Sequence, residues 1–157
     1  MNKILSVLFV CTGNSCRSIM AEGLLKKRLK ELGKTHIQVH SAGTRAMDGL
    51  SPVDNTISVM SEAGVDVSDY KSTDLTNDMI RNSDLILVME PTHKIEVLRR
   101  VPEASSKTYL LREFGKKNRE SDYGSHEVID PIGKSLEEYR FCLLSIKQEV
   151  ERIAELL

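Results

Sequence analysis

Residues 4–18 read ILSVLFVCTGNSCRS, and the character of the chain changes abruptly in the middle of this stretch. Positions 4–10 are mostly apolar and rich in β-branched residues, as in a strand that is buried on both faces of a sheet. From Arg17 onward, apolar residues recur at helical spacing until Gly33, which predicts an amphipathic helix. A buried strand therefore leads through a short polar loop, residues 11–18, directly into a helix.

The same alternation of strand and helix continues along the rest of the chain. We predict further strands and helices over 37–40, 52–63, 85–89, 92–100, 108–111 and 136–156, with a turn at 41–43 and a polar stretch at 112–126. Strands that alternate with helices imply an α/β fold with a parallel sheet covered on both faces. Ligands of such sheets bind beyond the carboxyl ends of the strands, which is where residues 11–18 lie.

Length and charge exclude several classes of protein. A chain of 157 residues fits one domain over 1–157, because a domain of this size buries roughly two thirds of its unfolded surface. The 22 basic and 23 acidic residues leave a formal charge of −1, so no global positive field favours nucleic acid or an anionic membrane. The apolar run is much shorter than the roughly 20 residues of a membrane span, and no signal-peptide pattern opens the chain. With only three cysteines, we expect a cytoplasmic protein with reduced thiols.

The loop at residues 11–18 has the composition of an anion site that also carries a nucleophile. Backbone amides between a strand and a helix N-terminus can turn inward around an anion, and this environment also stabilises a thiolate. Five residues separate Cys11 from Arg17, so we expect a ring with the sulfur at its base and the guanidinium reaching in from the rim. A planar guanidinium can hold two phosphoryl oxygens at once. The sequence therefore predicts that Cys11 attacks phosphorus while Arg17 binds the phosphoryl group.

Other residues of the loop are predicted to support this chemistry. The Ser18 hydroxyl is placed to donate a hydrogen bond to the sulfur, and Asn14 and Ser41 can brace the loop. The alternative is a buried structural cysteine with Arg17 on the surface. The ordered succession of strand, glycine, asparagine, arginine, serine and helix favours the functional interpretation. The predicted phosphate-binding residues are Thr12, Gly13, Asn14, Ser15, Cys16 and Ser18.

Displacement at phosphorus also requires a proton for the leaving group, and therefore a carboxylic acid within reach. Asp130 is the best candidate, because the apolar pair at 128–129 suggests partial burial and Pro131 stiffens the backbone. In a second step the same carboxylate can take a proton from water. Asp122 and Asp48 are weaker candidates, since nothing around them indicates burial.

With these residues in view, the whole chain resembles the low-molecular-weight protein tyrosine phosphatase family, in particular its bacterial members and the related protein arginine phosphatases. The motifs that carry the resemblance lie at 9–18, 20–22, 41–43 and 130–139. The resemblance implies a single-domain three-layer sandwich with a four-stranded parallel sheet in the order 2-1-3-4, flanked by helices. It also implies a phosphocysteine intermediate and neither metal nor cofactor.

The family pattern assigns a role to each matching residue. Cys11 is the nucleophile, Arg17 the phosphate binder and Asp130 the acid and then the base, with support from Asn14, Ser18 and Ser41. The implied partners are a phosphorylated protein substrate and inorganic phosphate or sulfate in the loop, and we expect a monomer or weak dimer.

Two departures from the family pattern concern the substrate. Members that cleave phosphotyrosine commonly carry a bulky aliphatic residue where Ser15 stands, and aromatic residues after the Asp-Pro pair, where this chain has Ile132. The arginine phosphatases instead have a small hydroxyl residue at the Ser15 position. The choice between phosphotyrosine and phosphoarginine stays open at this point.

Two other kinds of function remain as alternatives. Cys16 permits a disulfide with Cys11, as in arsenate reductases or thiol redox sensors on this scaffold, but the relay of such reductases needs a further cysteine pair and this chain has only Cys142. A non-catalytic module that captures phosphoproteins would need neither the thiol nor Asp130. The four histidines show no metal-ligand spacing and are expected to be structural or exposed: His36, His40, His93 and His126.

Overall fold

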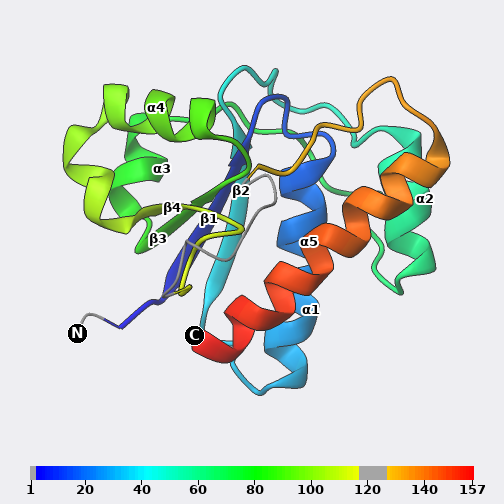
Figure 1. Cartoon of the computed structure of the whole chain (residues 1–157), viewed down its shortest axis with the longest axis horizontal. Helices are drawn as coiled ribbons and strands as arrows, with labels where there is room; N and C mark the ends of the chain where they lie inside the picture. The colour runs from blue at the N-terminus through cyan, green and yellow to red at the C-terminus, as the bar shows by residue number, and fades with distance from the viewer. Residues whose placement is uncertain (1–2, 117–126) are drawn as a thin grey trace.

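The computed structural model, which describes residues 3–116 and 127–157, contains a parallel sheet between two layers of helices (Figure 1). The strand order is β2-β1-β3-β4, which confirms the predicted fold class and order. The strands are β1 (Ser6–Cys11), β2 (Gln38–Gly43), β3 (Leu85–Val88) and β4 (Thr108–Leu110). The helices are α1 (Arg17–Glu31), α2 (Asp54–Glu62), α3 (Asn77–Asn82), α4 (Pro91–Arg100), the 3-10 helix η1 (Pro102–Lys107) and α5 (Leu136–Leu156).

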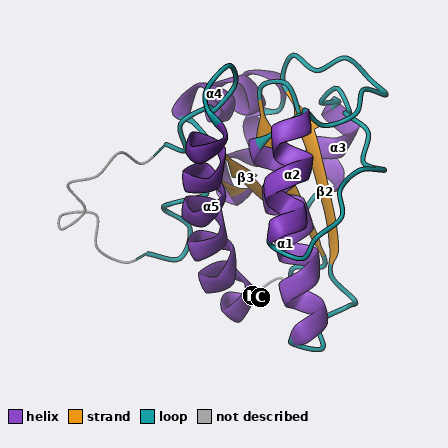
Figure 2. Ribbon diagram, turned by 90° about the vertical axis from the view of Figure 1, so that its right-hand side faces the viewer, coloured by secondary structure: helices purple, strands orange, loops and turns teal. Residues whose placement is uncertain are grey.

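The central strand β1 is buried on both sides, as its continuous hydrophobicity predicts. Val7 and Phe9 face a core formed with α1, α2 and α5, whereas Leu8 and Val10 face a second core formed with α3, α4 and η1. Figure 2 shows α1, α2 and α5 together in front of the strands, with α3 and α4 behind them. The two cores hold the sheet rigidly between the layers.

The predicted turn at 41–43 is wrong. Residues 41–43 do not form a turn but complete β2, where they pair in parallel with Phe9, Val10 and Cys11 of β1. The small residues of this segment resemble a turn in sequence, but their backbone groups are satisfied by the neighbouring strand. As a result, β2 extends to the level of Cys11 and ends beside the loop at 11–18.

The sequence analysis missed α3 and η1, since each has only six residues and such a short element shows little hydrophobic periodicity. The polar stretch predicted at 112–126 is described only as far as residue 116, so Asp122 and His126 lie outside the described residues. In the described parts of the chain, no helix is both long and apolar enough to cross a lipid bilayer.

Because the strands are parallel, their carboxyl ends meet at one edge of the sheet. Residues 11–18 follow β1, residues 44–49 follow β2, and the N-terminus of α4 follows β3 at this edge. The segment at 127–130 joins them, because Val128 N donates to the carbonyl of Met89 at 2.8 Å. The topology thus brings four separate stretches of sequence to one place.

Candidate active site

The loop that joins β1 to α1 forms a shallow bowl whose floor is buried and whose rim is open. Cys11 is 3% exposed at its floor, and Thr12, Gly13 and Ser15 on the rim are half-buried. Helix α1 begins at Arg17 with no acidic residue in its first turn, so its positive end favours an anion at the loop. This geometry suits an anion above the sulfur.

Two groups of the loop donate directly toward the sulfur. The backbone N–H of Asn14 lies 3.2 Å from Cys11 Sγ, and Ser18 Oγ lies 2.8 Å from it. Asn14 Nδ2 donates to the same Ser18 Oγ at 2.7 Å, so the hydroxyl accepts from the amide and has its own proton free for the sulfur. The predicted donation from Ser18 therefore has the right geometry.

Asn14 and Ser41, the two residues expected to brace the loop, are joined by hydrogen bonds. Asn14 adopts a left-handed backbone conformation, with φ of 52°, and its Oδ1 accepts from the backbone N–H of Thr73 at 2.8 Å. Its Nδ2 also donates to Ser41 Oγ at 2.9 Å, and Ser41 in turn donates to Glu22 Oε1 at 2.5 Å. Glu22 on α1 is thus the anchor of a chain of hydrogen bonds that ends at the sulfur.

Gly43 also proves necessary for the loop, although sequence reasoning treated it as part of a turn. A Cβ at this position would lie 2.4 Å from the carbonyl oxygen of Thr12 and 2.9 Å from the backbone nitrogen of Asn14. Both contacts are with backbone atoms, which cannot swing aside like a flexible side chain. Only glycine lets the end of β2 approach the loop this closely.

Arg17 is buried, although the sequence analysis expected its guanidinium to reach in from the rim of the loop. Its side chain is 2% exposed, and Nη1 donates to the carbonyl of Val128 at 2.7 Å while lying 3.1 Å from Glu90 Oε2. A buried guanidinium needs such a partner, because an unpaired buried charge is costly. Nη1 is thus occupied by two partners, whereas Nη2 lies 3.6 Å from Asp130 Oδ2.

Glu90 and His93 connect this arginine to the other side of the loop. His93 Nδ1 accepts from the backbone N–H of Glu90 at 3.1 Å, so the ring proton of the neutral imidazole is on Nε2. Nε2 lies 2.9 Å from Thr12 Oγ1 and 3.4 Å from Glu90 Oε2. Burial, together with the charge of Arg17, lowers the pKa of His93 to about 4, so the ring is neutral at pH 7.

The sequence analysis missed Glu90 as a site residue and expected only a structural or exposed role for His93. His93 is buried and structural, and His36 and His40 are exposed. The only local signal is the position of Glu90 and His93 directly after a buried strand, at the sheet edge where ligands bind. In the described parts of the chain, no three His, Cys, Asp or Glu side chains are grouped so that they could hold a metal ion.

Asp130 reaches the site from the segment before α5. Its Oδ2 lies 3.6 Å from Arg17 Nη2, and its Oδ1 accepts from the backbone N–H of Ile132 at 3.1 Å. The side chain is 43% exposed, so it is partly buried as expected. Of the two apolar residues at 128–129 that suggested this partial burial, Val128 is buried but Ile129 is 64% exposed. Asp48 is exposed and accepts from the backbone of Asp74.

The remaining loop residues secure the bowl to its surroundings. The Ser15 carbonyl accepts from Thr56 Oγ1 at 3.1 Å, which ties the rim to α2. Cys16 is buried, and its sulfur lies 3.6 Å from the Tyr139 hydroxyl of α5. Burial raises the pKa of the Cys16 thiol, which keeps it protonated and weakly nucleophilic.

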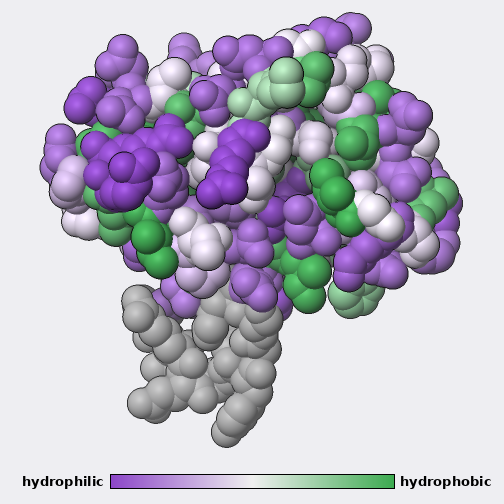
Figure 3. Space-filling model, turned by 90° about the horizontal axis from the view of Figure 1, so that it is seen from above, coloured by the Kyte–Doolittle hydropathy of each residue, from purple (hydrophilic) through white to green (hydrophobic). Residues whose placement is uncertain are grey.

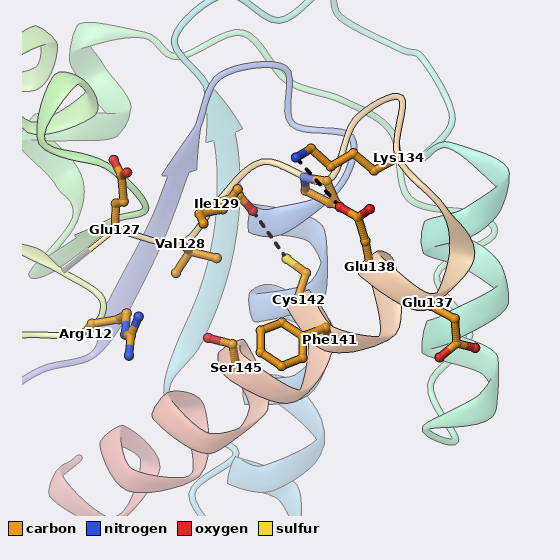
Figure 4. A pocket seen from close by; sticks show the side chains of 11 residues that line it. Arg112, Glu127, Val128, Ile129, Lys134, Glu137, Glu138, Phe141, Cys142 and Ser145 are labelled. Carbon is orange, nitrogen blue, oxygen red and sulfur yellow. Dashed lines mark hydrogen bonds and ion pairs between the residues drawn. The ribbon is translucent and has the colours of Figure 1, made fainter. Parts of the chain in front are cut away.

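Cys142 is buried, with 6% of its surface exposed. It lies on α5 at the wall of a pocket of about 520 Å³ beside the Asp130 segment, and its sulfur faces the carbonyl of Ile129 at 3.8 Å (Figure 4). Burial raises the pKa of this thiol to about 12. Cys142 is therefore a poor nucleophile and poorly suited to a thiol relay.

Comparison with known proteins identifies the family of the chain. The family model described as low molecular weight phosphotyrosine protein phosphatase matches residues 6–157. The chain belongs to this family. The new phosphatase is therefore a phosphoric monoester hydrolase that acts on phosphorylated substrates.

Named relatives of this phosphatase include both tyrosine and arginine phosphatases. It is 33% identical over 151 residues to a protein-arginine-phosphatase of Geobacillus stearothermophilus, covering 96% of this chain and 95% of the relative. The crystal structure of the tyrosine phosphatase AmsI of Erwinia amylovora superposes with a TM-score of 0.86 at 34% identity, covering 99% and 94%. The structure of a cysteine-to-serine mutant of YwlE arginine phosphatase with a phosphorylated active-site serine has a TM-score of 0.86 at 27% identity, covering 97% and 95%.

Proposed function

We propose that this phosphatase hydrolyses phosphorylated proteins through a phosphocysteine formed on Cys11. The observation that carries the proposal is the convergence of three groups at one sheet edge. Cys11 Sγ accepts from Ser18 and from the Asn14 amide, and the buried guanidinium of Arg17, the first residue of α1, lies 3.6 Å from the Asp130 carboxylate. A module that only captured phosphoproteins would need neither the sulfur nor the carboxylate.

In the first step the thiolate of Cys11 attacks phosphorus. The new S–P bond forms as the bond from phosphorus to the leaving group breaks, and protonated Asp130 donates its proton to that leaving group. The Nε and Nη2 edge of Arg17 holds two equatorial oxygens, where charge develops in the transition state. The positive end of α1 acts on the same charge.

In the second step a water molecule replaces the leaving group. Asp130, now a carboxylate, takes a proton from the water as its oxygen bonds to phosphorus and the S–P bond breaks. The products are inorganic phosphate and the Cys11 thiolate, which accepts the hydrogen bond from Ser18. The enzyme thus returns to its starting state.

Replacement of Asp130 by asparagine tests this assignment. We expect kcat for a phosphopeptide to fall roughly 10²-fold, the usual scale for loss of a general acid. For an aryl phosphate with a strongly acidic phenol, the rate of the first step should fall less, because the leaving group needs no proton. Binding of inorganic phosphate, measured by competitive inhibition, should persist. If both substrates retain wild-type kcat, the role assigned to Asp130 is wrong.

Two substrate classes fit this mechanism, phosphotyrosine and phosphoarginine. Ser15 stands on the rim with its hydroxyl near Cys16, and Ile132 is 50% exposed beside Asp130. The small, polar rim residue favours a polar guanidino leaving group, and the arginine phosphatase among the relatives supports this choice. The AmsI tyrosine phosphatase, with equally good superposition, supports phosphotyrosine.

The variant Ser15→Ile separates these two substrates. The larger apolar side chain should improve kcat/KM for a phosphotyrosine peptide relative to a phosphoarginine peptide, by about tenfold if it buries one aromatic face. Release of inorganic phosphate from both peptides by both enzymes measures the ratio. An unchanged ratio contradicts a selective role for Ser15.

For the protein in the cell we propose a cytoplasmic location and a monomeric or weakly dimeric state. The thiol chemistry supports the location, because the nucleophile must stay reduced. The proposed chemistry supports the oligomeric state, because every assigned group comes from one chain.

A further inference from the structure

A second cavity opens beside the catalytic loop, on the side of α4. Its volume is about 440 Å³, and it shares Thr12 with the loop. Thr44 and Arg45 line it from the segment after β2, where Thr44 N donates to the carbonyl of Cys11 and Arg45 N to that of Thr12, both at 2.9 Å. These hydrogen bonds fix the wall of the cavity to the catalytic loop.

The opposite wall is one face of α4. Thr92, Glu96 and Arg99 are spaced by four and three residues, so they lie on the same side of the helix and all line the cavity. Figure 3 looks down on this edge of the molecule and shows strongly hydrophilic side chains gathered over the half that contains α4. The cavity is therefore polar on both walls.

The charge of this cavity is positive. Glu96 is bound by Arg99 through Nε at 3.0 Å and Nη2 at 2.6 Å, and by Arg100 Nε at 2.8 Å. These guanidinium groups lower the pKa of Glu96 to about 2, so it is ionised but surrounded by two cations. Across residues 3–116 and 127–157, the exposed guanidinium of Arg45 makes no ion pair or hydrogen bond. Of the residues that line the cavity, Arg45 and Arg99 are cationic and Glu96 is anionic, and Arg100 pairs with Glu96 without lining the cavity.

The cavity is not the site of the scissile phosphoryl group. Cys11 does not line it, and the Thr12 hydroxyl is already bonded to the neutral His93 ring, which adds no charge. Thr44 and Thr92 add hydroxyl groups, which can donate to a carboxylate. Since Thr12 directly follows the nucleophile, a substrate residue next to the phosphorylated one is within reach, at about 3.5 Å per extended residue.

We propose that this cavity binds the carboxylate of an aspartate or glutamate one or two residues from the phosphorylated residue of the substrate, with Arg45 as the principal contact. The inference rests on the proposed phosphoprotein phosphatase function and adds a preference for acidic sequences. The contact between Arg45 and the substrate carboxylate should be as strong as a solvent-accessible ion pair. This strength corresponds to a preference of about three- to fivefold in kcat/KM for an acidic peptide.

The test uses matched peptides with glutamate or glutamine flanking the phosphorylated residue, in a phosphotyrosine and a phosphoarginine series. For wild type, kcat/KM should be about three- to fivefold higher for the glutamate peptide, mainly through KM, and the ratio should decline as salt is raised. Arg45→Gln should bring the ratio close to one and leave hydrolysis of a small aryl phosphate unchanged. Arg81→Gln, a change at an exposed arginine of α3, should keep the preference.

The outcomes separate this inference from the proposed function. Equal rates on the two peptides for wild type, or a preference that survives in Arg45→Gln, overturn the acidic subsite while the phosphatase function stands. Failure of wild type to hydrolyse any of the phosphopeptides or the aryl phosphate overturns both. A peptide with phosphoserine at the flanking position provides a third arm. The carboxylate assignment is wrong if wild type prefers the phosphoserine peptide but not the glutamate peptide, and if Arg45→Gln abolishes that preference. The subsite would then bind a phosphate.

Discussion

Cys11→Ser is expected to lower kcat by at least about 10⁴-fold, the scale on which loss of a catalytic nucleophile acts. A serine hydroxyl is far less acidic than a thiol, and the loop supplies hydrogen-bond donors to the sulfur, Ser18 and the Asn14 amide, but no general base. The side chain is nearly the same size, so the fold should be retained. The measurement is steady-state release of phosphate from an aryl phosphate, together with binding of inorganic phosphate by calorimetry.

The matched control for this prediction is Cys142→Ser. Cys142 is also a buried cysteine, but its sulfur contacts the Ile129 carbonyl and makes none of the hydrogen bonds that Cys11 Sγ makes with Ser18 and Asn14. We expect this variant to stay within about threefold of wild-type kcat, apart from a small loss of stability on burying a hydroxyl. The assignment of the nucleophile is wrong if the two serine variants lose activity equally, or if Cys11→Ser retains turnover.

Arg17→Lys is expected to lower kcat/KM by roughly 10²- to 10³-fold, although the positive charge is kept. The guanidinium contacts the Val128 carbonyl and Glu90 through Nη1, and the proposed mechanism assigns its Nε and Nη2 edge to the phosphoryl group. A single ammonium group cannot occupy both positions with the same geometry. Initial rates at several substrate concentrations, with circular dichroism to check folding, measure the effect.

The control for the arginine change is Arg81→Lys on α3. This arginine is half-exposed and pairs loosely with Asp78 at 3.8 Å, so its replacement should leave kcat/KM unaltered. An Arg17→Lys enzyme with activity within threefold of wild type would mean that point charge alone, not the planar fork, binds the phosphoryl group. Such a result would also mean that the contact between Arg17 Nη1 and Glu90 is not required for binding of the phosphoryl group.

Much of the fold could be predicted because local pattern and tertiary environment agree. The continuous apolar run of β1 reflects burial on both faces, and the stripe along α5 reflects its packing on α1. Prediction failed where the deciding contacts are not local. Residues 41–43 belong to β2 because β1 satisfies their backbone, and the six-residue α3 is too short to show a period.

In the candidate site, too, local sequence pattern could be read in advance, whereas long-range contacts could not. The cluster of Cys11, Arg17 and Ser18 could be proposed from the sequence, because all three lie within eight consecutive positions at the junction of a strand and a helix. The buried placement of Arg17 could not be foreseen, since it depends on Glu90, 73 positions further along the chain. The roles of Glu22 and Gly43 likewise arise from contacts with Ser41 and with the Thr12 backbone, which only the folded chain brings together.

The most direct test of the central claim is to find the phosphoryl group on the enzyme during turnover. Wild-type protein mixed with an aryl phosphate is quenched rapidly, digested and examined by mass spectrometry under conditions that preserve phosphothioesters. We expect one phosphoryl group on the peptide that contains Cys11, which forms in a burst and is lost to water as phosphate appears. A burst of phenol release with the phosphoryl group on any other residue, or turnover with no phosphoenzyme at all, would contradict the mechanism.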